Sequence, residues 1–280
     1  MEIDPHPGVK IVHKGPTTAS LVFAAGRGSR MEGFDGNKTL LPLLPSGSPY
    51  EGSSPILLHV LDSLPPGPKA VVVNHRKEAV IEATRSYDPI YCEQPVLNGT
   101  GGALMASMEF IENRRYDRLL ITMGDVPLVR PASYERLLHV LSEFHMAVLG
   151  FRPEKKREYG VLETDNDTVK RIIEWTYWKE FPGDRQESLD ICNSGIYAVR
   201  KEELIRYLHI LEKTPHTVIK KRDGETVEVK EYFITDLVQL MYKDGLKTGY
   251  IIAEDEEEVM GVDDLPSLKK VQEIFRERRG

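Results

Sequence analysis

The stretch LVFAAGRGSRMEGFDGNK, residues 21–38, decides the fold and indicates the chemistry of this chain. Its first five residues are apolar or small, which is typical of a buried β-strand. Gly26 and Gly28 follow at once, and glycines let the backbone approach a ligand and present N–H groups to an anion. Arg30 and Lys38 add positive charge in the same short segment. We therefore interpret residues 21–38 as a strand that leads into a phosphate-binding loop.

This loop differs from two well-known phosphate-binding patterns. It lacks the Lys-Ser/Thr pair of GxxxxGK[ST], and Met31 and Glu32 stand where GxGxxG needs a third glycine. Two glycines beside scattered surface cations can also form an ordinary tight turn. The complete ordered set favours a nucleotide-phosphate site, and its members are Ala24, Ala25, Gly26, Gly28, Arg30, Met31 and Lys38.

Strand-like and helix-like segments alternate along the rest of the chain. This alternation predicts an α/β fold, a Rossmann-like, mostly parallel sheet flanked by helices, with a small mixed-sheet extension after residue 146. The expected strands are 20–25, 69–74, 90–93, 118–123, 147–152, 160–164, 169–175, 190–199, 225–230 and 247–253. The expected helices are 55–64, 76–86, 101–113, 132–144, 201–212, 235–243 and 266–278.

We expect a single nucleotidyl-binding domain over residues 19–280, preceded by an extension of residues 1–18. Within that domain, residues 19–146 would bind the nucleotide, 147–253 the second substrate, and 254–280 would form a metal loop and a helix. The Pro- and Gly-rich residues 42–54 are expected to be a loop. The acidic run EDEEE, residues 254–258, is typical of a solvated turn.

Composition excludes several classes of function. The chain has 280 residues, with 37 Lys and Arg against 44 Asp and Glu, for a net charge of −7. A broad basic face for nucleic acid is therefore not expected. No apolar run reaches the length of a membrane helix, and the start of the chain has no signal-peptide core. We expect a cytoplasmic protein in which Cys92 and Cys192 are buried, reduced thiols.

Two acidic motifs are candidate metal sites. Gly124-Asp125 ends the apolar run 118–123, and an aspartate there can bind Mg²⁺ or simply begin a turn before Pro127. The motif GVDD brings Asp263 and Asp264 to the start of the last helix, and capping that helix needs only Asp264. Asp263 is then free to face the same edge of the sheet as Asp125. Carboxyl ends of parallel strands meet at one edge, so the Gly loop belongs there too.

A second Gly-rich loop, residues 94–103, is a candidate base-recognition site. The neutral amide of Gln94 can read a base edge, and Gly99 with Thr100 can bring backbone close to a planar ring. A flexible turn in which Thr100 caps a helix is the alternative. Gly160, Glu174 and Asn193 have ordinary alternatives as well: a strand start, a surface carboxylate and a bulge.

The order of these motifs carries a resemblance. The series AAGRGSRM…K, Q-x4-GTGGA, MGDVP, EYG, IIEW, NSGIY, EYFITD and GVDD covers residues 19–275. It resembles the sugar-phosphate nucleotidyltransferases, and within them the uridylyltransferase half of bacterial bifunctional N-acetylglucosamine-1-phosphate uridylyltransferases. The hexapeptide-repeat half of those enzymes is not found in residues 1–280, so acetyl transfer is not expected.

The resemblance implies a fold, a reaction and a set of site residues. The fold would be that of the nucleotide-diphospho-sugar transferases. The reaction would be Mg²⁺-dependent formation of an NDP-sugar and pyrophosphate from an NTP and a sugar-1-phosphate, most simply UTP and N-acetylglucosamine-1-phosphate. Catalytic roles would belong to Arg30 and Lys38, and metal binding to Asp125 and Asp263. The implied nucleotide-binding residues are Ala24, Ala25, Gly26, Gly28, Gln94, Gly99, Thr100 and Gly124. The implied sugar-binding residues are Gly160, Glu174, Asn193 and Thr235.

The chain departs from the family pattern at three places. GVDD stands for the family's GVNN, Met123 replaces a tyrosine, and residues 176–189 are rich in aromatic side chains near the sugar side. The substrates therefore stay open. Relatives with an AAGxGxRM loop use molybdopterin, methylerythritol phosphate or phosphocholine as acceptor, and a silent nucleotide-sugar sensor is a further alternative.

Overall fold

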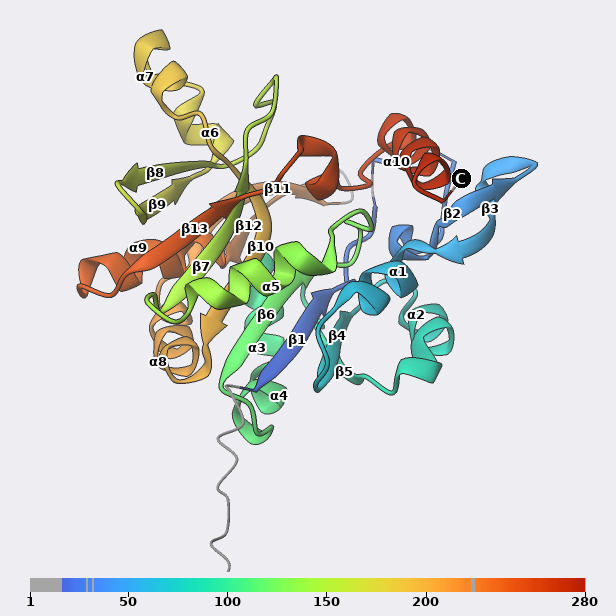
Figure 1. The fold of residues 1–280 in the computed structure, drawn as a ribbon, viewed down its shortest axis with the longest axis horizontal. Coiled ribbons are helices and arrows are strands. Elements are labelled where there is room, and N and C mark those ends of the chain that lie inside the picture. Colours follow the sequence, from blue (N-terminus) through green and yellow to red (C-terminus); the bar gives the residue numbers. More distant parts are fainter. Residues whose placement is uncertain (1–16, 29, 32, 223–224, 280) are drawn as a thin grey trace, which may run out of the picture.

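A nine-stranded sheet forms the centre of the computed structural model, which describes residues 17–28, 30–31, 33–222 and 225–279 (Figure 1). Most of the predicted extension, residues 1–16, lies outside the described residues. The main path of the sheet runs β13-β7-β10-β6-β1-β4-β5, and β8 and β9 pair at its side. These strands are β1 (Thr18–Phe23), β4 (Lys69–Val73), β5 (Ile90–Glu93), β6 (Arg118–Met123), β7 (Met146–Phe151), β8 (Val161–Asp165), β9 (Thr168–Ile173), β10 (Cys192–Arg200) and β13 (Thr248–Ile252).

The strands around the Gly loop are parallel. β1 pairs with β4 on one side and β6 on the other, and β4 pairs with β5. β10 runs antiparallel between β6 and β7, and β8 and β9 form the small antiparallel addition that the sequence predicts. The predicted fold class, a mostly parallel sheet flanked by helices with a mixed extension, is confirmed.

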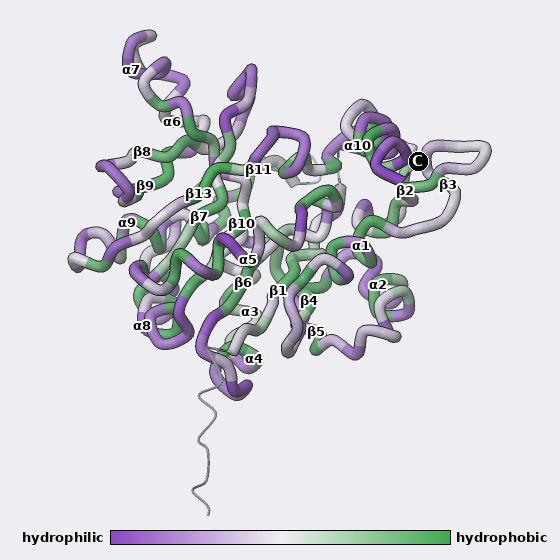
Figure 2. The backbone as a smooth tube through the Cα atoms, viewed as in Figure 1, coloured by the Kyte–Doolittle hydropathy of each residue, from purple (hydrophilic) through white to green (hydrophobic). Residues whose placement is uncertain are grey.

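Helices cover both faces of this sheet, so its strands are buried on both sides. Successive side chains of a strand point to opposite faces. Val22 and Val71 accordingly belong to one hydrophobic core, and Leu21 and Val72 to the other. This is why the apolar runs are continuous, as Figure 2 shows along the central strands. One face is covered by α1 (Ile56–Ser63), α2 (Lys77–Thr84), α5 (Pro131–Val140) and α10 (Leu265–Glu277), the other by α3 (Thr100–Ala106), α4 (Met108–Asn113), α8 (Lys201–Leu211) and α9 (Thr235–Lys243).

Two local predictions were wrong, and one correctly predicted strand has an unexpected partner. Residues 42–54 are not a loop but the hairpin of β2 (Pro42–Ser46) and β3 (Ser48–Pro55), whose Gly52 has φ +150° and passes close to the Leu44 carbonyl. The expected helix 101–113 is two helices that meet at Ser107, whose hydroxyl donates to the Ala103 carbonyl. The predicted strand at 225–230 is β12 (Glu225–Glu231). It pairs with β11 (His216–Arg222), a strand that the alternating sequence pattern did not predict.

Short helices complete the chain. α6 (Trp175–Trp178) and α7 (Gly183–Ser188) extend away from the body at the upper left of Figure 1. The described part of the chain also forms the 3₁₀ turns η1 (Lys38–Leu40), η2 (Arg85–Tyr87) and η3 (Glu256–Val259). Cys92 and Cys192 are buried free thiols, as expected. Within the residues described, no helix is both long and apolar enough to cross a membrane.

Candidate active site

The carboxyl ends of β1 and β6, which the sequence predicts to lie at one edge of the sheet, are neighbours in the structure. β1 and β6 run parallel with Phe23 opposite Met123, so the Gly loop and Gly124-Asp125 leave the sheet side by side. Gly124 N–H donates to the Phe23 carbonyl at 2.9 Å. A Cβ on Gly124 would lie 2.9 Å from that carbonyl oxygen, so this close junction requires glycine. The carboxyl edge of the sheet therefore carries both motifs.

Lys38 joins the two candidate metal ligands. Its ammonium group forms an ion pair with Asp125 and a 2.8 Å ion pair with Asp263 Oδ1. Arg30 also approaches Asp263 Oδ1, at 3.4 Å. The side chains of Lys38 and Asp125 are only 14% and 15% exposed, whereas that of Asp263 is 43% exposed. We call Lys38, Asp125 and Asp263 the ionic cluster.

Burial and charge act in opposite directions on Lys38. Removal from water by itself lowers the pKa of its ammonium group, but attraction to Asp125 and Asp263 outweighs this effect, and the pKa is raised. Lys38 is therefore protonated throughout the physiological range. A protonated amine at this position is a fixed positive charge and cannot serve as a base.

The ionic cluster also shows where a cation can bind. Carboxylates from two distant segments converge on a single ammonium group, so their oxygens already surround one cationic position. Mg²⁺ is held in such sites by one or two carboxylates together with phosphate oxygens. Over residues 17–28, 30–31, 33–222 and 225–279, the structure has no group of three or more His, Cys, Asp and Glu arranged to hold a metal. The donor set thus fits an ion shared with a phosphate ligand rather than a closed protein site.

Asp264 has the capping role that the sequence assigned to it. Its carboxylate accepts a hydrogen bond from the Ser267 N–H at 2.9 Å, and the Ser267 hydroxyl accepts one from the Asp264 N–H at 3.0 Å. This reciprocal capping box begins α10. Hydrogen bonding to Ser267 lowers the pKa of the Asp264 carboxyl. Asp263 is left free to face the edge that carries Asp125, as expected, and there it pairs with Lys38.

Asn37 organises the loop and was missed by the sequence analysis. It is 2% exposed, and its amide nitrogen donates to the carbonyls of Ala24 and His75, both at 2.9 Å. Its amide oxygen accepts from the N–H and hydroxyl of Thr39 at 3.0 and 2.8 Å. Asn37 thereby fixes the residue next to Lys38 to the end of β1. An asparagine immediately before a short helical turn is a capping signal that the sequence did contain.

The glycines of the first loop have distinct roles. Gly28 has φ +62°, and a Cβ there would lie 3.2 Å from the Lys38 Cβ, so the loop backbone packs on the lysine stem. At Gly26 a Cβ would meet no atom of the described residues within 4 Å. Ala24 and Ala25 are buried at the end of β1. The loop can therefore present its backbone to a ligand beside the ionic cluster.

The second Gly-rich loop is built differently from the expectation. Gln94 is 4% exposed, and its amide nitrogen donates to Asn98 Oδ1 and the Gly99 carbonyl, both at 3.1 Å. The hydroxyl of Thr100 accepts from the Ile234 N–H rather than capping its own helix, whose N-cap is Gly99. The backbone that Gly99 approaches is that of Tyr232. The structure therefore shows Gln94 and these glycines shaping the loop; their role in reading a base stays a prediction.

We expect Gly99→Ala to destabilise the protein. Gly99 has φ +93°, and a Cβ there would lie 2.3 Å from the Tyr232 carbonyl oxygen, so both the backbone and the neighbouring chain must shift. The free energy of unfolding should fall by about 1–3 kcal/mol, which urea titration would measure. Gly183→Ala is the control, because a Cβ at Gly183 meets no atom within 4 Å. Equal stabilities of the two variants would contradict the steric reasoning.

The four residues assigned to the sugar side lie close together. The Thr235 hydroxyl donates to Glu174 Oε1 at 2.9 Å, and a Cβ on Gly160 would be 3.5 Å from Glu174 Oε2. Asn193 N–H donates to the Gly160 carbonyl at 2.8 Å. Burial raises the pKa of the Glu174 carboxyl. Residues beside β8 and β9, on β10 and on α9 thus form one polar group, whose role in sugar binding stays a prediction.

The bulge that follows Asn193 packs against Met123, two residues before Asp125. Gly195, with φ +81°, forms part of a bulge in β10, and a Cβ there would lie 3.2 Å from Met123 Cε at the end of β6. Tyr159 directly precedes Gly160 in the chain. Its burial raises the pKa of its hydroxyl, and the negative charges of Asp263 and Asp125 raise this pKa further. Met123, which replaces the family's tyrosine, therefore packs against the bulge in β10.

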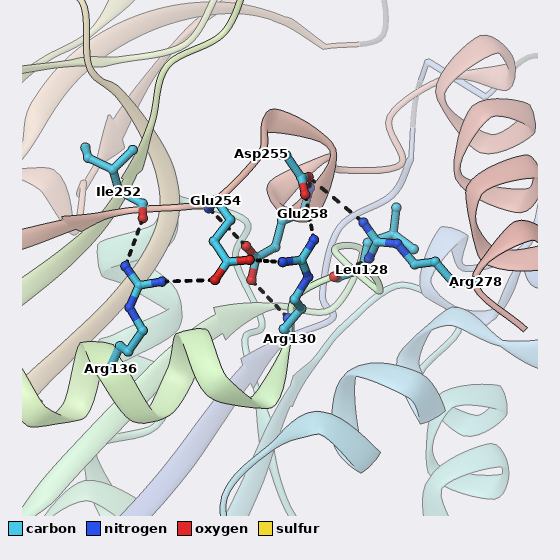
Figure 3. Close-up of polar contacts among 8 residues, drawn as sticks. All are labelled: Leu128, Arg130, Arg136, Ile252, Glu254, Asp255, Glu258 and Arg278. Atoms are coloured by element: carbon cyan, nitrogen blue, oxygen red, sulfur yellow. Dashed lines mark hydrogen bonds and ion pairs between the residues drawn. The ribbon is translucent and has the colours of Figure 1, made fainter.

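The acidic run at 254–258 was only partly predicted. Four of its side chains are at least partly exposed, but Glu258 is fully buried, and Arg130 contacts the turn with its side chain and its N–H. A run of like charges gives no signal for which member is buried. The contacts of Arg130 and Glu258 are shown in Figure 3.

Fold and site together define a nucleotidyltransferase-type enzyme: a parallel sheet whose carboxyl edge carries a Gly-rich cationic loop beside paired carboxylates. The family model described as the MobA-like NTP transferase domain matches residues 20–218. The chain belongs to this family. Together with the relatives described next, this match confirms the resemblance to the sugar-phosphate nucleotidyltransferases.

Several characterised proteins are similar to the chain. Bifunctional protein GlmU of Cereibacter sphaeroides is 30% identical over 270 residues, which are 94% of this chain and 53% of that protein. GlmU of Dichelobacter nodosus is 28% identical over 276 residues, again 53% of its length. The chain thus spans about half the length of these relatives.

Solved structures share the fold. The uridine diphosphate N-acetylglucosamine pyrophosphorylase of Trypanosoma brucei has a TM-score of 0.69 at 13% identity, covering 91% of this chain and 65% of that one. A nucleotidyl transferase from Methanothermobacter has a TM-score of 0.58 at 19% identity, covering 94% of this chain and 100% of that one. At these identities the likeness establishes the fold alone.

Proposed function

We propose that this protein transfers a nucleotidyl group from an NTP to a sugar-1-phosphate, forming an NDP-sugar and pyrophosphate. The observation that carries the proposal is the ionic cluster beside the Gly loop, with Lys38 between Asp125 and Asp263. The similarity to GlmU proteins supports UTP and N-acetylglucosamine-1-phosphate, or a related sugar phosphate, as the substrates. The division of residues 19–280 into nucleotide, sugar and metal segments stays part of this proposal.

The reaction would proceed by displacement at the α-phosphorus. An oxygen of the sugar phosphate attacks that atom, and pyrophosphate leaves. A phosphate dianion is already nucleophilic, so the site needs no general base, which agrees with a protonated Lys38. Lys38 and Arg30 would stabilise negative charge on the reacting phosphates, and the backbone of Gly26 and Gly28 would hold the triphosphate.

Mg²⁺ is the cofactor that the donor set fits. Asp125 and Asp263 would hold it, each through a carboxylate oxygen. The bound ion would supply positive charge to the α-phosphate and the leaving pyrophosphate. Lys38 would then be released from its two carboxylates and would be available to the triphosphate.

The acceptor would bind at the polar group on the neighbouring strands. Glu174, Asn193 and Thr235 offer hydrogen-bonding groups suited to sugar hydroxyls, and Gly160 allows close approach. This group adjoins the end of β6 through Gly195 and Met123. Residues 176–189, which include Tyr177 and Trp178, follow shortly after Glu174 in the chain and are the part most expected to change the sugar preference.

The test is a coupled pyrophosphate-release assay with Mg²⁺. It crosses UTP, CTP, GTP, ATP and dTTP with a panel of sugar-1-phosphates. Release with UTP and N-acetylglucosamine-1-phosphate supports the specific proposal, and release with another sugar pair keeps the reaction but replaces the substrates. Silence across the panel with intact NTP binding would refute sugar-phosphate turnover and favour a non-sugar acceptor or a sensor.

We expect Asp263→Asn to change metal dependence more than turnover. Asparagine keeps an oxygen ligand but removes one negative charge, and it is the residue that the family motif GVNN carries. The Mg²⁺ concentration for half-maximal activity should rise about three- to tenfold, since ligand charge tunes cation affinity. Asp264→Asn is the control, because asparagine also caps helices. Complete loss of activity of Asp263→Asn at all Mg²⁺ concentrations would contradict this role.

A further inference from the structure

The two carboxylates of the ionic cluster stand on segments far apart in the sequence. Asp125 follows β6, and Asp263 lies between β13 and α10. One backbone hydrogen bond joins these segments next to the carboxylates: Val262 N–H donates to the Asp125 carbonyl at 3.0 Å. A site for one cation needs the spacing of its ligands to be fixed, so any further contact between the two segments bears on metal binding.

Such contacts are concentrated around Arg130, at the end of the segment that begins with Asp125 (Figure 3). The guanidinium of Arg130 forms ion pairs with Glu254 and, at 2.6 Å, with Asp255 Oδ2. Its backbone N–H donates to Glu258 Oε1 at 3.1 Å. We call Arg130, Glu254, Asp255 and Glu258 the acidic clamp.

Glu258 is the buried centre of the clamp. It is 0% exposed, and besides the Arg130 N–H it accepts the Glu254 N–H at 3.4 Å. Its own N–H donates to Asp255 Oδ1 at 2.7 Å. A buried carboxylate without such partners is strongly unfavourable. The shape of the turn at residues 254–258 therefore depends on its contacts with Arg130.

Two further arginines hold the clamp from either side. Arg136 on α5 pairs with Glu254 at 3.7 Å and donates to the Ile252 carbonyl at 3.3 Å. Arg278 pairs with Asp255 at 3.9 Å and donates to the Leu128 carbonyl at 3.1 Å. Arg130 itself is the N-cap of α5, a helix anchored in the core. The clamp thus ties the chain before Asp263 to a rigid element.

We propose that Arg130 and Glu258 are positioning residues that set the spacing of Asp125 and Asp263 for a bound cation. Their contacts lie within the acidic clamp, and they act through the two segments that carry the carboxylates of the ionic cluster. The inference rests on the metal role in the proposed function. Partners that orient metal ligands typically change metal affinity by about 10- to 100-fold when removed.

The experiment measures Mn²⁺ binding by electron paramagnetic resonance, in the presence of inorganic pyrophosphate. This probe depends on neither the base nor the acceptor, so it is independent of turnover. The variants are Arg130→Met, Glu258→Ala and the conservative Arg130→Lys. Arg200→Met is the matched control, because the Arg200 guanidinium donates to the Leu141 carbonyl at 2.8 and 3.1 Å at the opposite edge of the sheet.

We expect Arg130→Met and Glu258→Ala to raise the Kd for Mn²⁺ by about tenfold or more. Arg130→Lys should recover part of the affinity. Lysine keeps the positive charge but cannot pair with Glu254 and Asp255 through two separate guanidinium nitrogens. Arg200→Met should lower the Tm without changing the Kd. The inference is overturned if the wild-type protein binds no Mn²⁺, if both clamp variants bind like wild type, or if Arg200→Met weakens binding equally. Pyrophosphate release by the wild-type protein is a separate measurement, which tests the proposed function and not the positioning role of Arg130 and Glu258.

Discussion

Lys38→Met is expected to lower kcat by about 100- to 1,000-fold, the usual effect of removing one charge-stabilising donor from a buried site. Lys38 is the cation that both carboxylates of the ionic cluster already contact, and its raised pKa keeps it charged. Methionine preserves most of the volume but none of the charge. The measurement is the steady-state rate of pyrophosphate release at saturating Mg²⁺ and both substrates.

Lys201→Met is the matched control for Lys38. The Lys201 ammonium group donates to the carbonyls of Glu112 and Arg114, at 2.8 and 2.7 Å, away from the ionic cluster. It should cost stability at most and leave kcat unchanged. Near wild-type turnover by Lys38→Met would remove Lys38 from the mechanism.

Lys38→Met should also bind metal more tightly in the absence of nucleotide. The ammonium group holds the position between Asp125 and Asp263, so an entering cation must displace it. Without it, the two carboxylates lose the cation that they share, although Arg30 still approaches Asp263. Mn²⁺ alone should therefore bind more tightly to the variant than to the wild-type protein. This gain of binding with loss of turnover would separate a charge role from simple misfolding.

Asp125→Asn is the second change with a large expected effect, again about 100- to 1,000-fold in kcat. Asp125 is mostly buried and lies where the parallel strands β1 and β6 end. Asparagine keeps the shape and one oxygen but removes the charge that opposes Lys38. The protein should remain folded, and raising Mg²⁺ should restore only part of the rate.

Asp117→Asn serves as its control. The Asp117 carboxylate accepts the N–H and the hydroxyl of Thr17 at 2.6 and 3.0 Å, at the start of β6 rather than its end. Activity of this variant should be unaffected at temperatures where it is folded. If Asp125→Asn and Asp117→Asn lose activity to the same extent, the loss reflects stability and not a metal role.

Local features of the site were predictable because their signals are contiguous in the chain. Buried parallel strands have continuous apolar runs, so the ends of β1 and β6 could be placed at one edge of the sheet. The capping role of Asp264 followed from its position before a helix, and it left Asp263 for the site. Even Asn37 carried a usable signal, since it caps the turn that contains Lys38.

Other features had no local signal. The hairpin β2–β3 contains prolines and glycines that usually indicate a loop, and its pairing became visible only in the fold. The close approaches of Gly99 and Gly101 are to Tyr232, a residue of a distant segment. Which glutamate of EDEEE is buried depends on the position of Arg130, and nothing within the run distinguishes Glu258 from its neighbours.

The sequence by itself determined the α/β class, the strand-to-loop motif at residues 21–38 and the identity of the charged groups at the site. Periodicity, caps and glycine patterns act over a few residues, so they can be read along the chain. Only the tertiary structure decided that Lys38 sits between Asp125 and Asp263, and that Arg130 and Glu258 tie their segments together. Those contacts join residues brought together by sheet order and helix packing, and their energies depend on burial that exists only in the folded chain.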